Sequence, residues 1–226
     1  AAPIWAGAKC TAIEPLRRVN RLSTLRVAYA YRTVSDVAIG VIAAKMPVDI
    51  RALEMRRLYA QQGIKHTNEH THAMEEWQSR WDRANNGRWR YQLIPNIHDW
   101  LSRKHGSLDY YTTQIVTGHG CFRQYFSRFR IVDEPWCAEC PGIPGNAKHV
   151  SFVCPRFMAE RAELEEITGV QLSANNLIAT MCHSQRNWIS HYHRLSMLLV
   201  RKILKKKKHT HIHWGPYATR WPKRSI

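Results

Sequence analysis

Hydrophobic side chains recur every three or four residues along most of the chain, and this spacing predicts a mainly α fold. Residues 13–32 show it clearly, because their apolar side chains would share one helical face opposite a face rich in arginine. The apolar positions are Leu16, Val19, Leu22, Leu25 and Tyr29. Two shorter helices are expected over residues 35–47 and 49–63, since capping residues precede both and a proline or a glycine follows. The first 62 residues should therefore form a short helical bundle.

The middle of the chain predicts further helices separated by polar segments. Residues 64–76 are polar and are expected to form a linker into a fourth helix, on which Trp77 and Trp81 share one face. Two more helices are expected over residues 107–129, with a break at the glycines of residues 118–120. The side chains expected to face inward there are Tyr111, Ile115, Phe122, Phe126 and Phe129.

The last part of the chain predicts two helices and an irregular tail. One helix should begin at Pro155 and end at Gly169, and the next should carry an apolar stripe. That stripe consists of Trp188, Tyr192, Leu195, Leu199 and Ile203. Beyond residue 208 no periodicity is left, so the tail is expected to be disordered on its own. The expected segments are 1–62, a linker at 63–76, a helical connector at 77–132, a cysteine-rich segment with its following helix at 133–169, C-terminal helices with a basic end at 170–208, and a tail at 209–226.

The charge of the chain is strongly positive and unevenly placed. The 226 residues include 34 Lys and Arg against 17 Asp and Glu, a formal net charge of +17. No acidic residue follows Glu166, whereas 11 of the basic residues do. Such asymmetry favours a polyanionic partner, most often nucleic acid and less often an anionic membrane surface. A merely solubilising basic tail is the simpler alternative.

Two other features of the sequence indicate where in the cell the protein is expected to act. No apolar run approaches the roughly 18 residues of a membrane-spanning helix, and the first residues lack the pattern of a secretory signal. We therefore expect an intracellular protein with reduced thiols and no membrane partner. The chain begins at Ala1 without a methionine, which suits a fragment of a longer polypeptide, although removal of an initiator methionine gives the same result.

Residues 137–154 predict a metal site. Cys137 and Cys140 are separated by two residues, and His149 precedes Cys154 by four residues after a spacer rich in turn formers. Three sulfurs and one imidazole at this spacing favour a tetrahedral zinc site. Because all four positions are filled by protein ligands, the zinc should be structural. A chance run of buried cysteines is the alternative.

Two other sets of residues leave their role open. His66, His70 and His72 could bind a metal, but no thiol accompanies them. The aromatic residues that flank the cysteine cluster could either stack on unpaired bases or form a small core of the metal-binding segment. They are Trp136, Phe152 and Phe157.

No catalytic residue is assigned within the chain. It contains no adjacent Asp pair, no phosphate-binding glycine loop and no nucleophile motif. An active site confined to this segment is therefore not expected.

A collinear series of motifs resembles one known family. The motifs are "APIWAGA", "AYRTVSDVA", "RWDRANNGRW", "LIPNIHDWL", "YYTTQIVTGHGCFRQYFSRF" and, after the cysteine cluster, "CPRFMAERAEL". This series, from Ala2 to about Ile167, resembles the C-terminal part of the Pol polyprotein of insect non-LTR retrotransposons. The greatest likeness is to the type-1 elements that insert into ribosomal RNA genes.

This resemblance implies both a fold and a function. Residues 2–62 would form the thumb-like end of a reverse transcriptase, followed by helices around a CCHC zinc knuckle and by the basic tail. The parent polyprotein would be an RNA-directed DNA polymerase with an endonuclease, and its palm carboxylates and Mg would lie upstream of Ala1. Its partners would be the element's RNA and chromosomal target DNA, so it would act in the nucleus during target-primed reverse transcription.

The basic residues expected to contact nucleic acid fall into two groups. On the thumb-like side they are Arg17, Arg18, Arg21 and Arg26, and at the end of the last helix they are Lys205, Lys206, Lys207 and Lys208. A free-standing, zinc-dependent nucleic-acid-binding protein without catalytic activity is the main alternative function. A protein-interaction module is a third.

Overall fold

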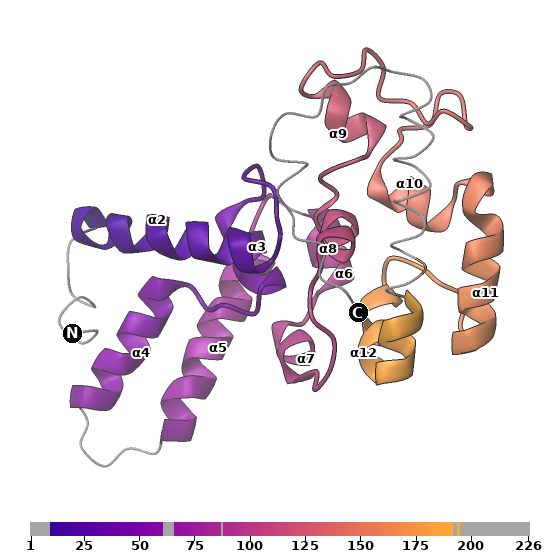
Figure 1. The fold of residues 1–226 in the computed structure, drawn as a ribbon. Helices are drawn as coiled ribbons and strands as arrows, with labels where there is room; N and C mark the ends of the chain where they lie inside the picture. Colours follow the sequence, from indigo (N-terminus) through magenta and orange to yellow (C-terminus); the bar gives the residue numbers. More distant parts are fainter. Residues whose placement is uncertain (1–9, 61–65, 87, 192–193, 195–226) are drawn as a thin grey trace, which may run out of the picture.

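The computed structural model describes residues 10–60, 66–86, 88–191 and 194 (Figure 1). The helices are α2 Cys10–Val27, α3 Asp36–Ile42, α4 Val48–Ala60, α5 His66–Asp82, α6 Arg88–Leu93, α7 Ile97–Ser102, α8 Tyr110–Thr117, α9 Arg123–Ser127, α10 Ala147–Phe152, the 3₁₀ turn η1 Pro155–Phe157, α11 Met158–Thr168 and α12 Leu177–His183. Residues 185–191 are helical as well. The described part contains no strand, only an isolated bridge between Trp136 and Pro144. The predicted mainly α fold is thus confirmed.

The helices at the start of the chain are organised around α3. All five residues from Ala38 to Ile42 are buried, so this short helix is covered on every side. α2, α5 and α8 each contact it, and α4 lies against α5 (Figure 1). α3 therefore joins the N-terminal helices to the middle of the molecule.

The predicted linker at residues 63–76 is corrected by the structure, because α5 already begins at His66. Ala73 is buried one turn before Trp77, and both are only 1% exposed. The imidazole of His70 lies 3.0 Å from a carboxylate oxygen of Glu54 on α4. This polar sequence forms a helix because its side chains contact residues of another helix. It therefore lacks the apolar stripe by which a helix is predicted from sequence.

The structure also corrects the prediction for α2, because the face expected to be buried is largely exposed. Leu16, Val19 and Leu22, which were expected to be buried, are 40%, 66% and 47% exposed. Of the predicted stripe, Leu25 is buried, at 5% exposed. The opposite face, which carries arginines, is turned toward α3 and α4 instead, because carboxylates lie there.

The middle helices fit their predictions closely. α8 and α9 are separated by a turn in which Gly118 and Gly120 have φ of 68° and 124°. Any residue with a Cβ would be strained at these angles, and a Cβ on Gly120 would meet the side chain of Gln114 at 1.9 Å. Phe129 is the exception, since it lies just after α9 and is 50% exposed.

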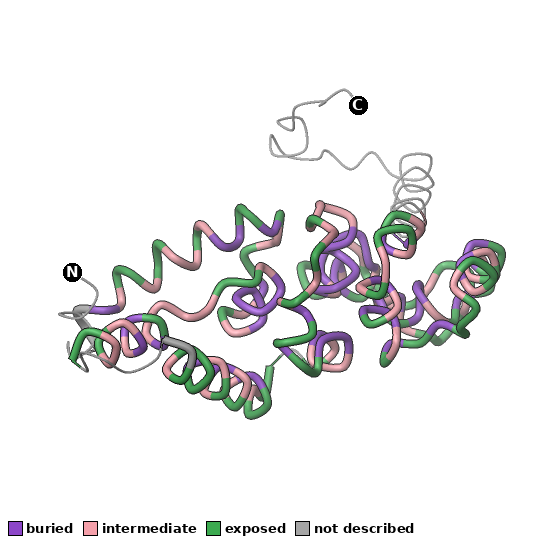
Figure 2. The backbone as a smooth tube through the Cα atoms, turned by 90° about the horizontal axis from the view of Figure 1, so that it is seen from below, coloured by how far each residue is buried: buried purple, intermediate pink, exposed green. Residues whose placement is uncertain are grey.

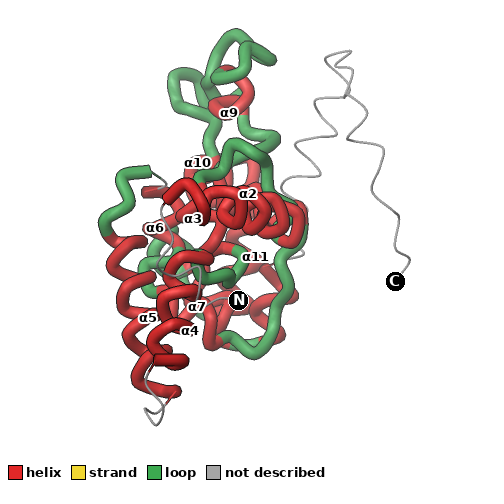
Figure 3. The backbone as a smooth tube through the Cα atoms, turned by 90° about the vertical axis from the view of Figure 1, so that its left-hand side faces the viewer, coloured by secondary structure: helices red, strands yellow, loops and turns green. Residues whose placement is uncertain are grey.

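One hydrophobic core runs through the described helices, from Leu25 on α2 to Trp188 near the end. Figure 2 shows the buried positions on the inner sides of the helices. Trp100 and Trp188 lie 6.2 Å apart between their ring centroids and join α7 to residues 185–191. Figure 3 shows the described residues as helices and loops, with loop structure around α9. No helix in the described ranges is long and apolar enough to cross a bilayer.

Candidate metal centre

A tight turn after α9 brings the first two cysteines together. Trp136 and Pro144 form an antiparallel bridge, and the Cys137 N–H donates to the Ile143 carbonyl at 2.7 Å. The Ile143 N–H donates in turn to the Cys140 carbonyl at 3.2 Å. This pairing closes the turn, so both thiols are held on the same loop.

The second pair of ligands comes from α10 and from Cys154, two residues beyond the end of that helix. The Asn146 side chain accepts a hydrogen bond from the His149 N–H at 2.8 Å, which caps α10 and fixes His149 in its first turn. The Cys154 N–H then donates to the His149 carbonyl at 2.8 Å. The chain therefore turns back on itself between these two ligands, just before η1.

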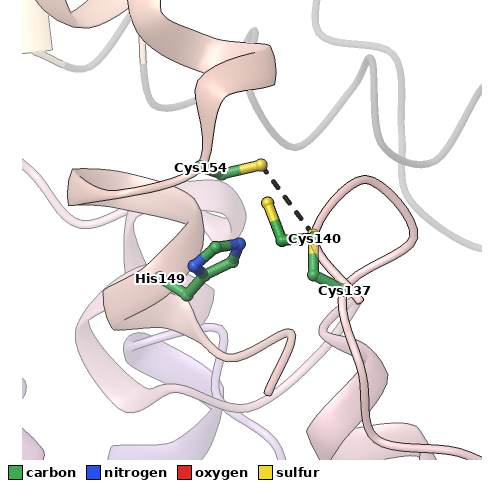
Figure 4. Close-up of side chains that lie close together, drawn as sticks. All are labelled: Cys137, Cys140, His149 and Cys154. Carbon is green, nitrogen blue, oxygen red and sulfur yellow. Dashed lines mark hydrogen bonds between the residues drawn. The ribbon is translucent and has the colours of Figure 1, made fainter. Parts of the chain in front are cut away.

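The four predicted ligands converge on one point. The ligand atoms of Cys137, Cys140, His149 and Cys154 all lie within 4.8 Å of one another (Figure 4). The sulfurs of Cys137 and Cys154 are 3.8 Å apart. With Zn–S bonds of about 2.3 Å, two sulfurs of a tetrahedral site lie roughly 3.8 Å apart. The cluster can therefore hold a metal ion, and its donor set and spacing are consistent with zinc.

The thiols differ in how readily they ionise. Burial opposes ionisation of Cys137, but the backbone N–H groups of Glu139 and Cys140 outweigh it and lower the pKa of this thiol. Burial raises the pKa of Cys154 to about 11, and the neighbouring Cys137 adds to the rise. One thiolate is favoured by the loop itself, whereas the others require a cation nearby.

Two arginines hold the ligand-bearing segments together. Arg156 pairs with Glu139 at 3.3 Å and so joins the segment after Cys154 to the first cysteine turn. Arg161 on α11 donates to the Cys154 carbonyl at 2.8 Å. Sequence reasoning missed these contacts, because nothing in the local pattern pairs residues 17 or 7 positions apart. The cap at Asn146 could have been found, since an Asn directly before a short helix is a known start signal.

The flanking aromatic residues, whose two possible roles the sequence left open, differ in how deeply they are buried. Phe157 is 2% exposed and belongs to the core. Phe152 is half-buried and packs on Trp89, with 6.2 Å between ring centroids. Trp136 is 39% exposed on the cysteine turn. Of the three, Trp136 is the ring that a base could stack on.

Two of the arginines predicted to contact nucleic acid are partly buried and paired with carboxylates of α3 and α4. Arg17 pairs with Asp49 at 3.0 Å. Arg21 pairs with Asp36 and also donates to two backbone carbonyls near the start of α3. The expectation that all four arginines of α2 form one exposed basic face is therefore corrected.

The remaining predicted contacts have different positions. Arg18 and Arg26 are exposed on α2. Lys205, Lys206, Lys207 and Lys208 lie outside the described residues. As for the histidine set, His70 contacts Glu54 and the His72 imidazole lies 2.9 Å from an Arg57 nitrogen.

Comparison with known proteins supports the motif resemblance. No family model matches the chain, and no solved structure matches it. The chain is 25% identical over 176 residues to "Retrovirus-related Pol polyprotein from type-1 retrotransposable element R1 4" of Nasonia vitripennis, covering 66% of the chain and 43% of that protein. It is 28% identical over 130 residues to the corresponding R1 Pol polyprotein of Popillia japonica, covering 57% and 50%.

A third relative, from Drosophila melanogaster, bears the name "Putative 115 kDa protein in type-1 retrotransposable element R1DM". Identity to it is 26% over 203 residues, which cover 78% of the chain and 19% of that protein. The chain thus spans about half the length, or less, of the curated relatives it matches. Together these relatives confirm that the chain is similar to the Pol polyproteins of type-1 retrotransposable elements of the R1 kind.

Proposed function

We propose that the chain is the C-terminal, nucleic-acid-binding part of a retrotransposon Pol polyprotein. In this role it holds template RNA and target DNA during target-primed reverse transcription in the nucleus. The convergence of three cysteines and a histidine, in a chain similar to R1 Pol polyproteins, is the observation that carries the proposal. The polymerase palm with its Mg, and the endonuclease, belong to other parts of the parent protein.

Cys137, Cys140, His149 and Cys154 would hold zinc as a structural ion. Bound there, it would compensate the charge of the thiolates and link the two ligand-bearing segments. Cys137 and Cys140 anchor the turn that carries the exposed Trp136, and His149 and Cys154 anchor α10 and η1. The residues of the centre thus hold a base-stacking ring in a fixed place beside helices with basic side chains.

The net charge supports the same role. A formal charge of +17 favours phosphate contacts, and such contacts give affinity without sequence choice. Sequence selection would then come from base stacking, base pairing or other parts of the parent.

Binding of labelled RNA and DNA oligonucleotides to the zinc-loaded chain tests this proposal. We expect the association constant to fall steeply between about 50 and 200 mM salt, as for any protein that neutralises several phosphates. Removal of zinc by a chelator should weaken binding further. A chain that binds neither nucleic acid at low salt, or that binds equally well with and without zinc, would rule out the proposed role.

A further inference from the structure

A basic cleft lies next to the metal centre. Its volume is about 400 Å³, and it is enclosed by α6, the end of α8, the α9 segment and the start of α10. Four cationic side chains line it, and the lining includes no carboxylate. The cations are Arg88, Arg90, Arg128 and Lys148.

The buried member of this set is Arg90, which is 7% exposed. One of its terminal nitrogens donates to Nε2 of His119 at 2.7 Å, while its Nε has no hydrogen-bond partner among the described residues. No ion pair to Arg90 occurs there either. A guanidinium stays charged in proteins, so its burial without a counter-charge is unfavourable unless an anion joins it.

Neighbouring side chains fix Arg90 in place without neutralising it. Burial, and then the charges of Arg90 and Arg128, lower the pKa of His119 to about 4, so its imidazole is neutral at physiological pH. Nε2 of this ring accepts from Arg90, and Nδ1 lies 2.8 Å from the Thr33 hydroxyl. The ring also stacks on Tyr125 with centroids 4.9 Å apart. The guanidinium is therefore preorganised, and its charge remains available.

Another cleft among the described residues shows the contrast. It lies between α2, α3, α4 and α5, has a volume of about 280 Å³ and is also lined by cations. There, however, Asp36 and Asp49 belong to the lining and pair with the arginines. Three of its arginines are thus paired with carboxylates, whereas the lining of the cleft beside the metal centre contains no carboxylate.

We propose that the cleft formed by α6, α8, α9 and α10 binds a phosphate group of a nucleic-acid backbone, with Arg90 and Arg128 as the main donors. This assignment rests on the proposed function for the source of the phosphate. The planar, forked guanidinium suits phosphate oxygens, and two of them around one cleft suit a bridging phosphodiester. Lys148 and Asn146 at the start of α10 complete one wall, and the metal ligand His149 lies in the same helix. Zinc held by His149 would therefore help to fix the position of this wall.

The test compares single arginine replacements in the zinc-loaded chain. Arg128 is exposed, so Arg128→Gln removes a cleft charge without opening the core. Arg56→Gln on α4 is the matched control, since Arg56 is also exposed but does not line the cleft. We expect Arg128→Gln to weaken binding of single-stranded oligonucleotides about five- to tenfold and to reduce the salt slope by about 0.7, the value for one lost phosphate contact. Arg56→Gln should change the affinity less than about twofold.

A second measurement observes the buried arginine directly. In the ¹⁵N-labelled chain, titration with inorganic phosphate should shift the Nε–H signal of Arg90, identified by its loss in Arg90→Lys. The Arg56 signal should not move in the same titration. If phosphate leaves the Arg90 signal unchanged, the cleft assignment is overturned whatever the chain does with nucleic acid.

The outcomes separate this inference from the proposed function. If the unaltered chain binds oligonucleotides with a steep salt dependence and Arg128→Gln behaves like Arg56→Gln, the assignment of phosphate binding to the cleft is wrong. The proposed function then still stands. If phosphate shifts Arg90 but the chain binds neither RNA nor DNA, the proposed function is wrong and the nucleic-acid source of the phosphate is excluded with it.

Discussion

Cys140 is the ligand whose replacement best separates metal binding from packing. It is half-buried, whereas Cys154 is 1% exposed and belongs to the hydrophobic core. Cys140→Ser should weaken zinc binding by about 100-fold or more and loosen residues 130–165, because a structural ion supplies much of the local folding free energy. Competition with a chromophoric chelator and amide hydrogen exchange measure the two effects.

The matched control for this replacement is Cys182→Ser. Cys182 is also half-buried but lies outside the ligand set, so zinc affinity should not change. Retention of unaltered zinc affinity by Cys140→Ser would contradict the metal centre.

His119 should make stability depend on pH. Its pKa is lowered from 6.5 to about 4, chiefly by burial and then by Arg90 and Arg128. Between these values the unfolded state binds the proton and the folded state does not, so the free energy of unfolding falls as the pH is lowered from 6.5 toward 4. The loss should be about 2 kcal/mol after allowance for solvent screening.

Urea unfolding at pH 7 and pH 4.5 measures this dependence. His119→Gln keeps an acceptor for Arg90 but does not titrate, so its stability should fall less over the same range. Since metal ligands also take up protons in acid, the informative quantity is the difference between the two proteins in excess zinc. Equal losses in both would show that His119 does not contribute.

At the scale of the elements, Asp49 holds α2 against its neighbours. Its carboxylate accepts from Arg17 of α2 at 3.0 Å and from Arg80 of α5 at 2.8 Å. Burial works against ionisation, but the two arginines hold the pKa of Asp49 below its usual value. Asp49→Asn keeps the shape and removes the charge, and it should lower the free energy of unfolding by about 1–3 kcal/mol.

Glu14→Gln is the comparison for Asp49→Asn. Glu14 pairs with Arg18 within one turn of the same helix at 3.4 Å, with both side chains exposed. Such a pair contributes little, so this change should lower stability by less than about 0.5 kcal/mol. Thermal unfolding that ranks the two variants in the opposite order would show that α2 is not held by Asp49.

The sequence predicted those elements whose signals are local. The four metal ligands lie within 18 residues, and the glycines between α8 and α9 predict the turn in which they lie. α5 was missed over its first turns because its partner, Glu54, lies on another helix. The faces of α2 were assigned wrongly for the same reason, since the carboxylates that turn Arg17 and Arg21 inward come from α3 and α4.

The basic cleft, like the faces of α2, could not be predicted from local sequence patterns. Its lining comes from four segments spread over residues 88–148, and no spacing rule connects them. An arginine is ordinarily an exposed residue, so the burial of Arg90 is visible only once the helices are placed. Such sites follow from tertiary packing and not from motifs.

For the whole molecule, the continuous core predicts that the metal centre and the N-terminal helices unfold together. The cluster that contains Leu25 and Trp77 also contains Val150 and Cys154, so the metal-binding segment and the first helices share buried contacts. In urea, tryptophan fluorescence and release of zinc to a chromophoric indicator should give the same midpoint. Zinc release well below the fluorescence transition would instead mean that the metal centre opens as a separate unit, and the zinc could then not set the position of α10 and its cleft relative to the rest of the core.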